Sequence, residues 1–308
     1  MPLFAAAQSS NATFNPSYVP VAVITGGTSG IGAAMAQALA KHLRGRVRII
    51  LVGRNKAAAD AILSSMHPAS QETPEAGYEF IACDLTLMAN IREMAEQLCA
   101  RLPKVNFLVH CAAITNFGGR VDTEEGLDVA LASRYYSRFA LTYGLLPLLQ
   151  RAADAGEKAS VQTVMAAGLG KGQVLMDDLG VKKGYTGMKA MKEATGYNDL
   201  MVAAFAERYP QIAFAHIHPG AVKTANIQFQ NPFAKVALFL LYPLVWYFFV
   251  EASVCAEYMI YALLDAKAGA VNRRSKTADD IGLKGFPTAE GAADALWKHS
   301  VEETHVVL

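Results

Sequence analysis

Short, nearly continuous apolar runs alternate along the chain with longer amphipathic stretches. Parallel strands buried on both faces give such runs, and the crossover helices between them give a period near 3.6. The pattern predicts strands at residues 20–25, 47–52, 78–83, 105–110, 160–165 and 212–217. It predicts helices at residues 31–43, 56–65, 87–101, 125–150 and 185–209. This order is typical of an α/β fold with a single doubly wound parallel sheet and helices on both faces.

Composition adds limits on domains and partners. A chain of 308 residues, 53% of them hydrophobic, can bury one large core. We therefore expect a single domain at 20–308, preceded by an extension at 1–19. That extension lacks a basic segment followed by an apolar one, so no secretory signal and a cytoplasmic protein are expected. A formal net charge of +1 argues against a nucleic-acid partner.

Cysteine spacing gives no sign of a metal site. Cys83, Cys99, Cys111 and Cys255 form no C-x-x-C pair, and no His, Asp or Glu cluster accompanies them. We expect free thiols and no bound metal.

The first predicted strand runs directly into a glycine-rich turn. Glycines allow positive φ and close backbone approach, so that the N–H groups of the next helix can face a pyrophosphate. A purely structural turn between a strand and a helix would also favour glycine. The position in the first βαβ unit favours phosphate binding. The residues of this predicted turn are Gly26, Thr28, Ser29, Gly30, Ile31 and Gly32.

The next two strand ends suggest how the rest of a dinucleotide would be held. The second strand is followed by Gly53-Arg54-Asn55, with no carboxylate for a ribose 2′-hydroxyl. Arg54 could bind a 2′-phosphate, which indicates NADP(H), or it could be a solvated arginine at a helix start. Asp84, after the third strand, could bond an adenine amino group, cap the following helix, or do both.

Tyr185 and Lys189 are the candidate catalytic pair. They lie four residues apart in the predicted helix at 185–209, hence on one face and in mutual reach. A free phenol has a pKa near 10, and a neighbouring ammonium would lower it by stabilising the phenolate. The spacing alone is common on solvated helices.

Four motifs in one order resemble the short-chain dehydrogenase/reductase family, with its Rossmann-type fold, over roughly residues 20–265. They are Thr25-Gly26-x-x-x-Gly30-x-Gly32, Cys83-Asp84-Leu85, Tyr185-x-x-x-Lys189 and His218-Pro219-Gly220-x-Val222-x-Thr224. The finer pattern around Lys183-Gly184-Tyr185 resembles a fungal branch that often serves specialised metabolism.

The resemblance implies roles for individual residues. The first motif would cradle the pyrophosphate, Asp84 would touch adenine, and the last motif would line the nicotinamide. Tyr185 would donate or accept the proton, while Lys189 would lower its pKa and bind the nicotinamide ribose. The remaining cofactor residues that we assign are Leu85, Ala112, Pro219, Gly220, Val222 and Thr224. A dimer or tetramer built on the long helices is also implied.

Three departures from the family pattern affect the chemistry. After the fourth strand the family usually reads Asn-Asn-Ala-Gly, whereas this chain reads His110-Cys111-Ala112-Ala113. Arg134 stands where the family carries a catalytic asparagine, and Ala166 stands where it carries a serine that bonds the substrate carbonyl. An arginine donates but cannot accept, and losing one preorganised donor costs around a hundredfold to a thousandfold in rate. The hydroxyls of Ser160 or Thr163 could replace the serine only if the alignment of this strand with the family motif is shifted by three residues. Other candidate replacements are Thr115, Asn116, Tyr135 and Tyr136.

An apolar run at 233–250 falls within a segment, 226–262, that corresponds to the family's substrate lid. We interpret it as a lid over an apolar substrate or a subunit contact. A peripheral membrane contact and a true membrane span remain alternatives.

The sequence thus predicts an NADP(H)-dependent oxidoreductase that acts on a carbonyl or alcohol of a hydrophobic small molecule. The alternative is a non-redox enzyme, such as a cyclase, isomerase or dehydratase, that retains the cofactor; Ala166 and Arg134 favour it. A catalytically silent cofactor-binding protein is a third reading, which the retained Tyr185 and Lys189 disfavour.

Overall fold

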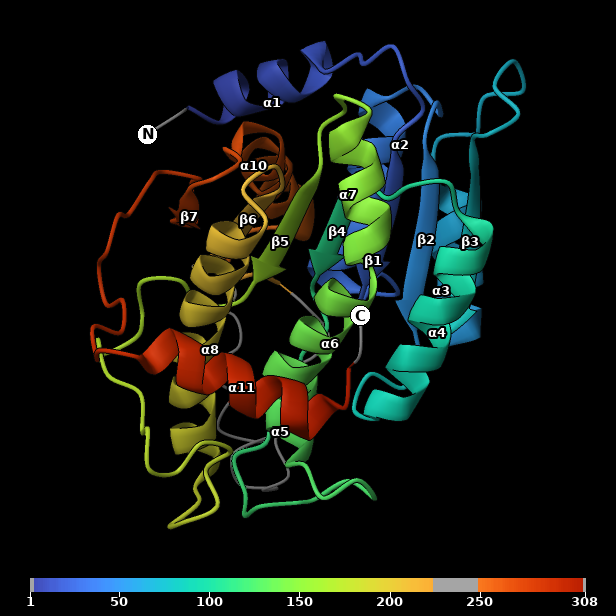
Figure 1. Ribbon diagram of the computed structural model, residues 1–308. Coiled ribbons are helices and arrows are strands. Elements are labelled where there is room, and N and C mark those ends of the chain that lie inside the picture. Colours follow the sequence, from blue (N-terminus) through green and yellow to red (C-terminus); the bar gives the residue numbers. More distant parts are fainter. Residues whose placement is uncertain (1–2, 224–248, 307–308) are drawn as a thin grey trace, which may run out of the picture.

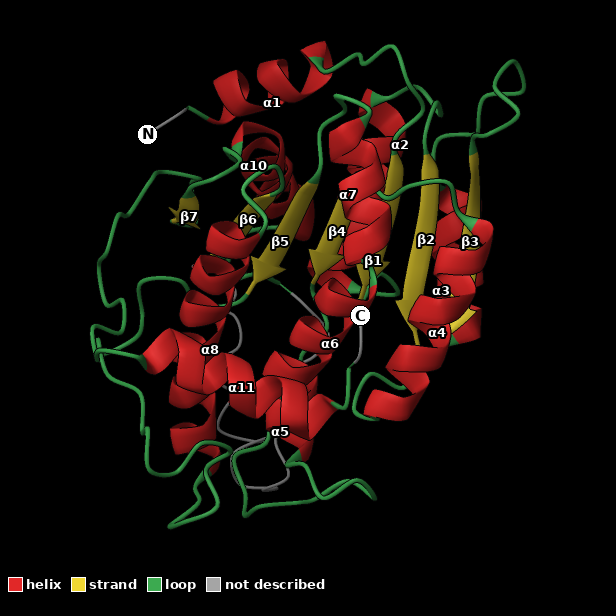
Figure 2. Cartoon of the chain, in the orientation of Figure 1, coloured by secondary structure: helices red, strands yellow, loops and turns green. Residues whose placement is uncertain are grey.

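A parallel sheet lies at the centre of the computed structural model, which describes residues 3–223 and 249–306 (Figure 1). Within that part of the chain, the seven strands follow the order β3-β2-β1-β4-β5-β6-β7. Their bounds are β1 (Val21–Thr25), β2 (Arg48–Gly53), β3 (Gly77–Ala82), β4 (Phe107–His110), β5 (Ser160–Val164), β6 (Ala213–Ile217) and β7 (Val271–Arg274). Figure 2 shows the strands running in one direction. The predicted strands are confirmed, and β7 is an additional strand at the edge.

Helices cover both faces of this sheet, and each face has its own apolar core. One core is formed with α2 (Gly30–His42), α3 (Lys56–Ser65) and α10 (Ala252–Asp265). The other is formed with α4 (Met88–Arg101), α6 (Ser137–Gly144), α7 (Leu146–Asp154) and α8 (Gly187–Arg208). The final helix, α11 (Ala292–Thr304), crosses the outside of α8 and α6 (Figure 1). The predicted doubly wound α/β fold is therefore confirmed.

The single helix predicted at 125–150 is wrong in detail. The segment consists of α5 (Val129–Leu131), a π-helical turn η1 (Ala132–Tyr136), α6 and α7. Within η1, the carbonyl of Arg134 accepts a hydrogen bond from Asn198 Nδ2 at 3.0 Å. Pro147 lies in the first turn of α7, where a missing N–H is tolerated. In the interior of one continuous helix at 125–150 the same proline would break the hydrogen-bond pattern.

The N-terminal extension contains α1 (Phe4–Thr13), which packs against α10 at the end of the sheet opposite the carboxyl ends of the strands (Figure 1). Asn11 is buried there and donates to Glu257 Oε2 at 2.8 Å. The extension is thus attached to the domain by a specific polar contact.

The predicted lid at 226–262 extends too far along the chain. Residues 252–262 belong to α10, whose Cys255, Met259 and Ile260 are buried. Positions 226–248 of the predicted lid lie outside the described residues. None of the helices within those residues has both the length and the apolar character needed to cross a membrane.

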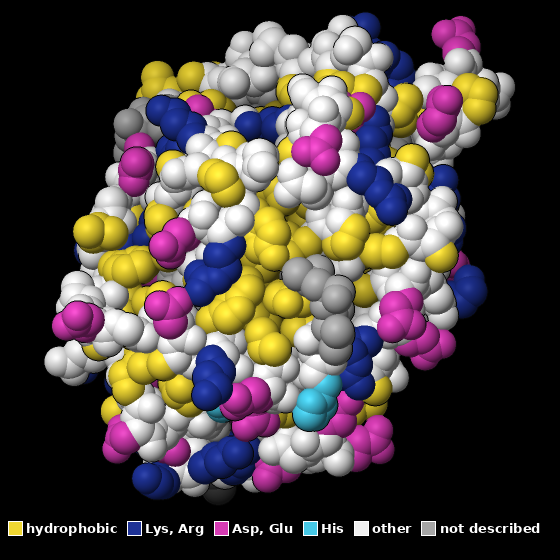
Figure 3. All heavy atoms as spheres, viewed as in Figure 1, with side chains coloured by type: hydrophobic (Ala, Val, Ile, Leu, Met, Phe, Trp, Pro, Cys, Tyr) yellow, Lys and Arg dark blue, Asp and Glu magenta, His cyan; other side chains and the backbone are white. Residues whose placement is uncertain are grey.

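Apolar side chains gather on one face between α8 and the α6–α7 pair (Figure 3). Beneath them, aromatic rings pack closely, including the Phe205 and Trp297 rings with centroids 4.8 Å apart. Trp297 belongs to α11, so the C-terminal helix completes the core on this face.

Candidate active site

The glycine-rich turn after β1 has the backbone geometry that the sequence predicts. Gly26 has φ +69°, and a Cβ there would lie 2.7 Å from the backbone nitrogen of Ala112. Helix α2 begins at Gly30, and the side chain of its N-cap Ser29 makes no capping hydrogen bond. The first N–H groups of α2 are thus not capped by that residue, which leaves an anion site of the kind found at helix N-termini.

A half-open cleft of about 550 Å³ lies against this turn at the carboxyl ends of the strands. Ten of the predicted cofactor residues line it: Gly26, Thr28, Ser29, Gly30, Ile31, Gly32, Arg54, Asp84, Leu85 and Ala112. The sequence analysis did not assign the rest of the lining to the cofactor, namely Gly53, Asn55, Ala58, Cys83, Thr86, Cys111, Ala113, Ile114, Thr115 and Ser133. Most of these flank a predicted residue at a strand end, which is the signal that could have found them.

Arg54 and Asp84 lie side by side at one part of the cleft. Arg54 is exposed, and its Nη1 lies 3.9 Å from Asp84 Oδ2. Asp84 Oδ1 accepts hydrogen bonds from the backbone nitrogen of Thr86 at 2.9 Å and from its hydroxyl at 2.8 Å. Asp84 therefore fixes its own turn. It does not cap α4, because Glu125 accepts from the first N–H groups of that helix, those of Met88 and Ala89.

The segment after β6 lies at the same edge of the sheet but outside the described cleft lining. Gly220 has φ +77°, and Val222 forms a parallel bridge with Val250. Cys255 Sγ donates to the carbonyl of Pro219 at 3.6 Å. Thr224 lies outside the described residues. The nicotinamide roles of Pro219, Gly220, Val222 and Thr224 remain predictions.

Tyr185 and Lys189 are not paired. Helix α8 begins at Gly187, with Thr186 as its N-cap, so Tyr185 precedes the helix. Lys189 Nζ instead lies 3.1 Å from Asp178 Oδ2 and donates to the carbonyl of Lys183 at 2.5 Å. The expectation that one helical face holds both side chains is wrong. The Thr186 hydroxyl accepts from the backbone nitrogen of Lys189, and this capping signal was readable in the sequence.

The environment of Tyr185 raises the pKa of its hydroxyl to about 12. Burial is the largest cause and the nearby Asp128 carboxylate the next, while Arg120 acts in the opposite direction. The hydroxyl oxygen is buried near the side chains of Asp128 and Asn116, but it makes no hydrogen bond of normal geometry among the described residues. Tyr185 is therefore protonated at neutral pH. Neither it nor Lys189 lines the described cleft.

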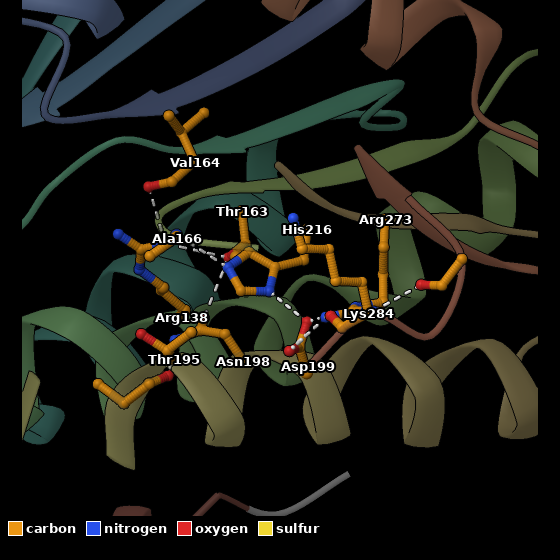
Figure 4. Close-up of polar contacts among 12 residues, drawn as sticks. Arg138, Thr163, Val164, Ala166, Thr195, Asn198, Asp199, His216, Arg273 and Lys284 are labelled. Atoms are coloured by element: carbon orange, nitrogen blue, oxygen red, sulfur yellow. Dashed lines mark hydrogen bonds and ion pairs between the residues drawn. The ribbon is translucent and has the colours of Figure 1, made fainter. Parts of the chain in front are cut away.

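Behind Ala166 lies a fully buried polar network (Figure 4). The backbone nitrogen of Ala166 donates to His216 Nε2 at 3.2 Å, and His216 Nδ1 bonds Asp199 Oδ1 at 2.7 Å. Burial lowers the pKa of His216, so the ring is neutral, with the proton on Nδ1 and the lone pair on Nε2. Arg273 binds both oxygens of Asp199, at 2.8 and 2.9 Å. The network fixes the chain at the end of β5 but offers no hydroxyl there.

The structure also separates the candidates for the missing hydroxyl. Tyr135 bonds Ser300 and Tyr136 bonds His299, so both point toward α11. The side chain of Asn116 bonds within its own loop. Buried Thr163 bonds Arg138, and buried Ser160 has no hydrogen-bond partner among the described residues. Thr115 alone among these candidates lines the cleft.

Arg134, at the position of the family's asparagine, holds the wall of this cleft. Its Nε donates to the carbonyl of Ile114 at 2.8 Å, and its Nη2 donates to the Thr115 hydroxyl at 2.7 Å. Its Nη1 lies 3.3 Å from Met165 Sδ. The guanidinium thus joins the loop after β4 to the end of β5.

Comparisons with known proteins agree with this geometry. The family profile described as short chain dehydrogenase matches residues 20–171. Oxidoreductase AN1596 of Emericella nidulans is 33% identical over 247 residues, which cover 80% of this chain and 71% of that protein. Oxidoreductase andH of Emericella variicolor is 30% identical over 246 residues, covering 80% and 70%. The structure of an NADPH-bound carbonyl reductase from chicken fatty liver superposes with a TM-score of 0.60 at 18% identity, over 86% of this chain and 99% of that one.

The chain therefore belongs to the short-chain dehydrogenase/reductase family. The predicted family is confirmed, and its similarity to fungal oxidoreductases agrees with the predicted branch.

Proposed function

We propose that this protein is an NADP(H)-dependent oxidoreductase acting on a carbonyl or alcohol of a hydrophobic small molecule. The observation that carries the proposal is the cleft at the carboxyl edge of the sheet, lined by the glycine-rich turn and by Arg54. Glycine at position 26 lets the turn approach the backbone of Ala112, where a Cβ would clash, and the N-terminal residues of α2, which Ser29 does not cap, line the cleft. The two fungal relatives named above are oxidoreductases, and one similar fold holds NADPH.

The proposed preference for NADP(H) over NAD(H) rests on the positive charge of Arg54, an exposed residue of the cleft lining. Arg54 is the residue that would hold a 2′-phosphate, through charge-assisted hydrogen bonds. One carboxylate oxygen of Asp84 accepts two hydrogen bonds from Thr86, and the other lies close to Arg54. Asp84 therefore does not offer a free carboxylate for a ribose hydroxyl. When bound, the cofactor supplies or accepts a hydride.

Tyr185 is our proposed proton donor to the substrate oxygen. The hydroxyl carries its proton at neutral pH, as a donor to a carbonyl must, but its raised pKa makes it a weaker acid than an unperturbed tyrosine. Its ring lies near Arg120, whose guanidinium carbon is 6.0 Å from the ring centroid. The ammonium of Lys189 is bound to Asp178 and to the carbonyl of Lys183, so its role is the less direct of the two.

Two observations favour a second candidate, a non-redox enzyme that keeps the cofactor. Ala166 provides no hydroxyl for a developing alkoxide, and the ammonium of Lys189 is bound to Asp178 rather than to Tyr185. Each would weaken ordinary carbonyl reduction.

The stoichiometry of turnover separates the two candidates. Purified protein is incubated with NADPH and a panel of apolar ketones, and NADPH absorbance is followed beside product formation. An oxidoreductase consumes one NADPH for each alcohol formed. Product formed while NADPH stays constant would instead establish the non-redox enzyme.

We also propose a homo-oligomer and a cytoplasmic role in specialised metabolism. The apolar face between α8 and the α6–α7 pair is a candidate subunit contact, because exposed apolar patches often mark interfaces. Light scattering coupled to size-exclusion chromatography would test this, and a mass equal to the 33.0 kDa chain would contradict it.

A further inference from the structure

Two arginines beside the cleft are buried without a carboxylate partner. Arg134 is 8% exposed and Arg138 is 1% exposed. Among the described residues, the hydrogen bonds of both go to carbonyls, hydroxyls and a thioether, and neither takes part in an ion pair. The sequence at 224–248 contains no Asp or Glu, so that segment brings no side-chain carboxylate either. Buried cations are normally paired, because desolvating a charge is costly.

The two guanidinium groups differ in how fully they are used. Arg138 is enclosed by Ala112, Thr163 and Val164 at the base of the site. Arg134 does not itself line the cleft, but it holds two residues that do, through the carbonyl of Ile114 and the hydroxyl of Thr115. A guanidinium carries five N–H donors. On each terminal nitrogen of Arg134 one N–H has no partner among the described residues, and the acceptor at Nη1 is a sulfur, which accepts weakly.

The surroundings make an anion favourable at this point. Burial lowers the pKa of Arg134, and Arg138 nearby carries the same charge. An anionic group would offset both penalties. The neighbouring side chains of Ile114, Met165 and Ala166 are apolar, so an anion here would be attached to an apolar molecule.

We propose that Arg134 determines specificity by binding a carboxylate on the substrate, so that the natural substrate is an apolar carboxylic acid. This inference rests on the proposed function, since it names the substrate class for the same site. The terminal nitrogens of Arg134 hold the carboxylate, Thr115 orients the guanidinium, and the apolar residues contact the rest of the molecule. Arg134 stands where the family carries an asparagine. An arginine cannot accept a proton in a relay, but it can bind a carboxylate.

Calorimetric titration of the NADP⁺-loaded protein with decanoate and with methyl decanoate tests this proposal. We expect wild type to bind decanoate at least about tenfold more tightly than the ester, the selectivity of a charge-assisted hydrogen bond. Arg134→Met should remove the selectivity, and Arg134→Lys should keep part of it. Arg92→Met is the matched control, because Arg92 is a half-buried arginine that bonds the carbonyl of Thr304, and it should leave the selectivity unchanged.

Equal affinity of wild type for acid and ester would overturn the proposal, as would full selectivity in folded Arg134→Met. If that variant does not fold, Arg134→Gln and Arg134→Lys provide the same comparison, with melting curves to confirm folding. NADPH affinity is measured on every variant. If an Arg134 variant binds NADPH more weakly but still prefers decanoate to its ester, the Arg134 guanidinium binds the cofactor and not the substrate. That result would also overturn the proposal. Failure of the protein to bind NADPH would refute the proposed function, while acid selectivity of the unliganded protein could still be measured.

Discussion

The ammonium of Lys189 lies 3.1 Å from Asp178 Oδ2, and the hydroxyl of Tyr185 makes no hydrogen bond with it. Asp178 also accepts from the backbone nitrogens of Lys182 and Lys183. This carboxylate thus holds the loop before α8 together and binds the ammonium of Lys189. The ammonium donates to Asp178 and to the carbonyl of Lys183, which together use two of its three N–H groups.

Asp178→Asn should lower the melting temperature at pH 7. Burial raises the pKa of Asp178, but hydrogen bonds from Lys183, Lys189 and Lys182 outweigh it, and the folded pKa is lowered. A lowered pKa stabilises the fold above the unfolded value of about 3.9, and the contribution is lost as the pH falls toward the folded value. The difference in melting temperature from wild type should therefore shrink below about pH 4. Asp177→Asn, at the exposed neighbour, should change little, and an equal effect of both substitutions would refute this role for Asp178.

Tyr185→Phe should abolish NADPH-dependent reduction while leaving NADPH affinity within a few fold, since the substitution removes only the hydroxyl. With a pKa of about 12, Tyr185 stays protonated, so the wild-type reduction rate should show no loss from this group between about pH 6 and 9. Steady-state rates across this range give the measurement. Undiminished activity of Tyr185→Phe would exclude Tyr185 as the proton donor.

Ala166→Ser should raise the rate of ketone reduction by roughly one to two orders of magnitude, because it returns a hydroxyl to the end of β5. The backbone of Ala166 is already fixed by His216, so the new side chain would start from a defined position. Ala166→Gly is the control without a hydroxyl and should bring no gain. An unchanged rate of NADPH consumption in Ala166→Ser would favour the non-redox enzyme.

Asp199→Asn should destabilise the fold by about 3–5 kcal/mol, because it leaves buried Arg273 without a counter-charge. The adjacent residue provides a matched control. Arg274 pairs with the exposed Asp265 at 2.7 Å, and Asp265→Asn should cost less than about 1 kcal/mol. Urea unfolding of both variants measures the difference. A similar loss of unfolding free energy in Asp199→Asn and Asp265→Asn would show that burial does not determine how much the Asp199–Arg273 pair stabilises the fold.

Local pattern was sufficient for six of the seven described strands and for ten residues of the cleft lining. Strands β1 to β6 are short, mainly apolar runs, and the residues predicted to bind phosphate follow β1 directly in sequence. Strand β7 was missed because Val271–Arg274 contains Asn272 and two arginines, which read as a polar loop. Arg273 is buried only because Asp199, on α8, supplies its counter-charge. Such a pair cannot be found without the tertiary fold.

The arrangement of the candidate catalytic residues could not be derived from their spacing. An interval of four places two side chains on one helical face only if both lie within the helix, and Tyr185 lies before the N-cap Thr186. The contacts of Arg134 depend on the π-helical turn η1 and on the loop after β4, which meet only in the folded chain. The absence of a hydroxyl at Ala166, in contrast, followed from the sequence alone.

Fluorescence titration of the wild-type protein with NADPH and NADH tests the central claim most directly. We predict that NADPH binds at least about tenfold more tightly, because Arg54 would hold the 2′-phosphate. Arg54→Asp should erase the preference, whereas Lys56→Asp, the same charge change two residues further on, should preserve it. Equal dissociation constants of wild type for NADPH and NADH would contradict the account.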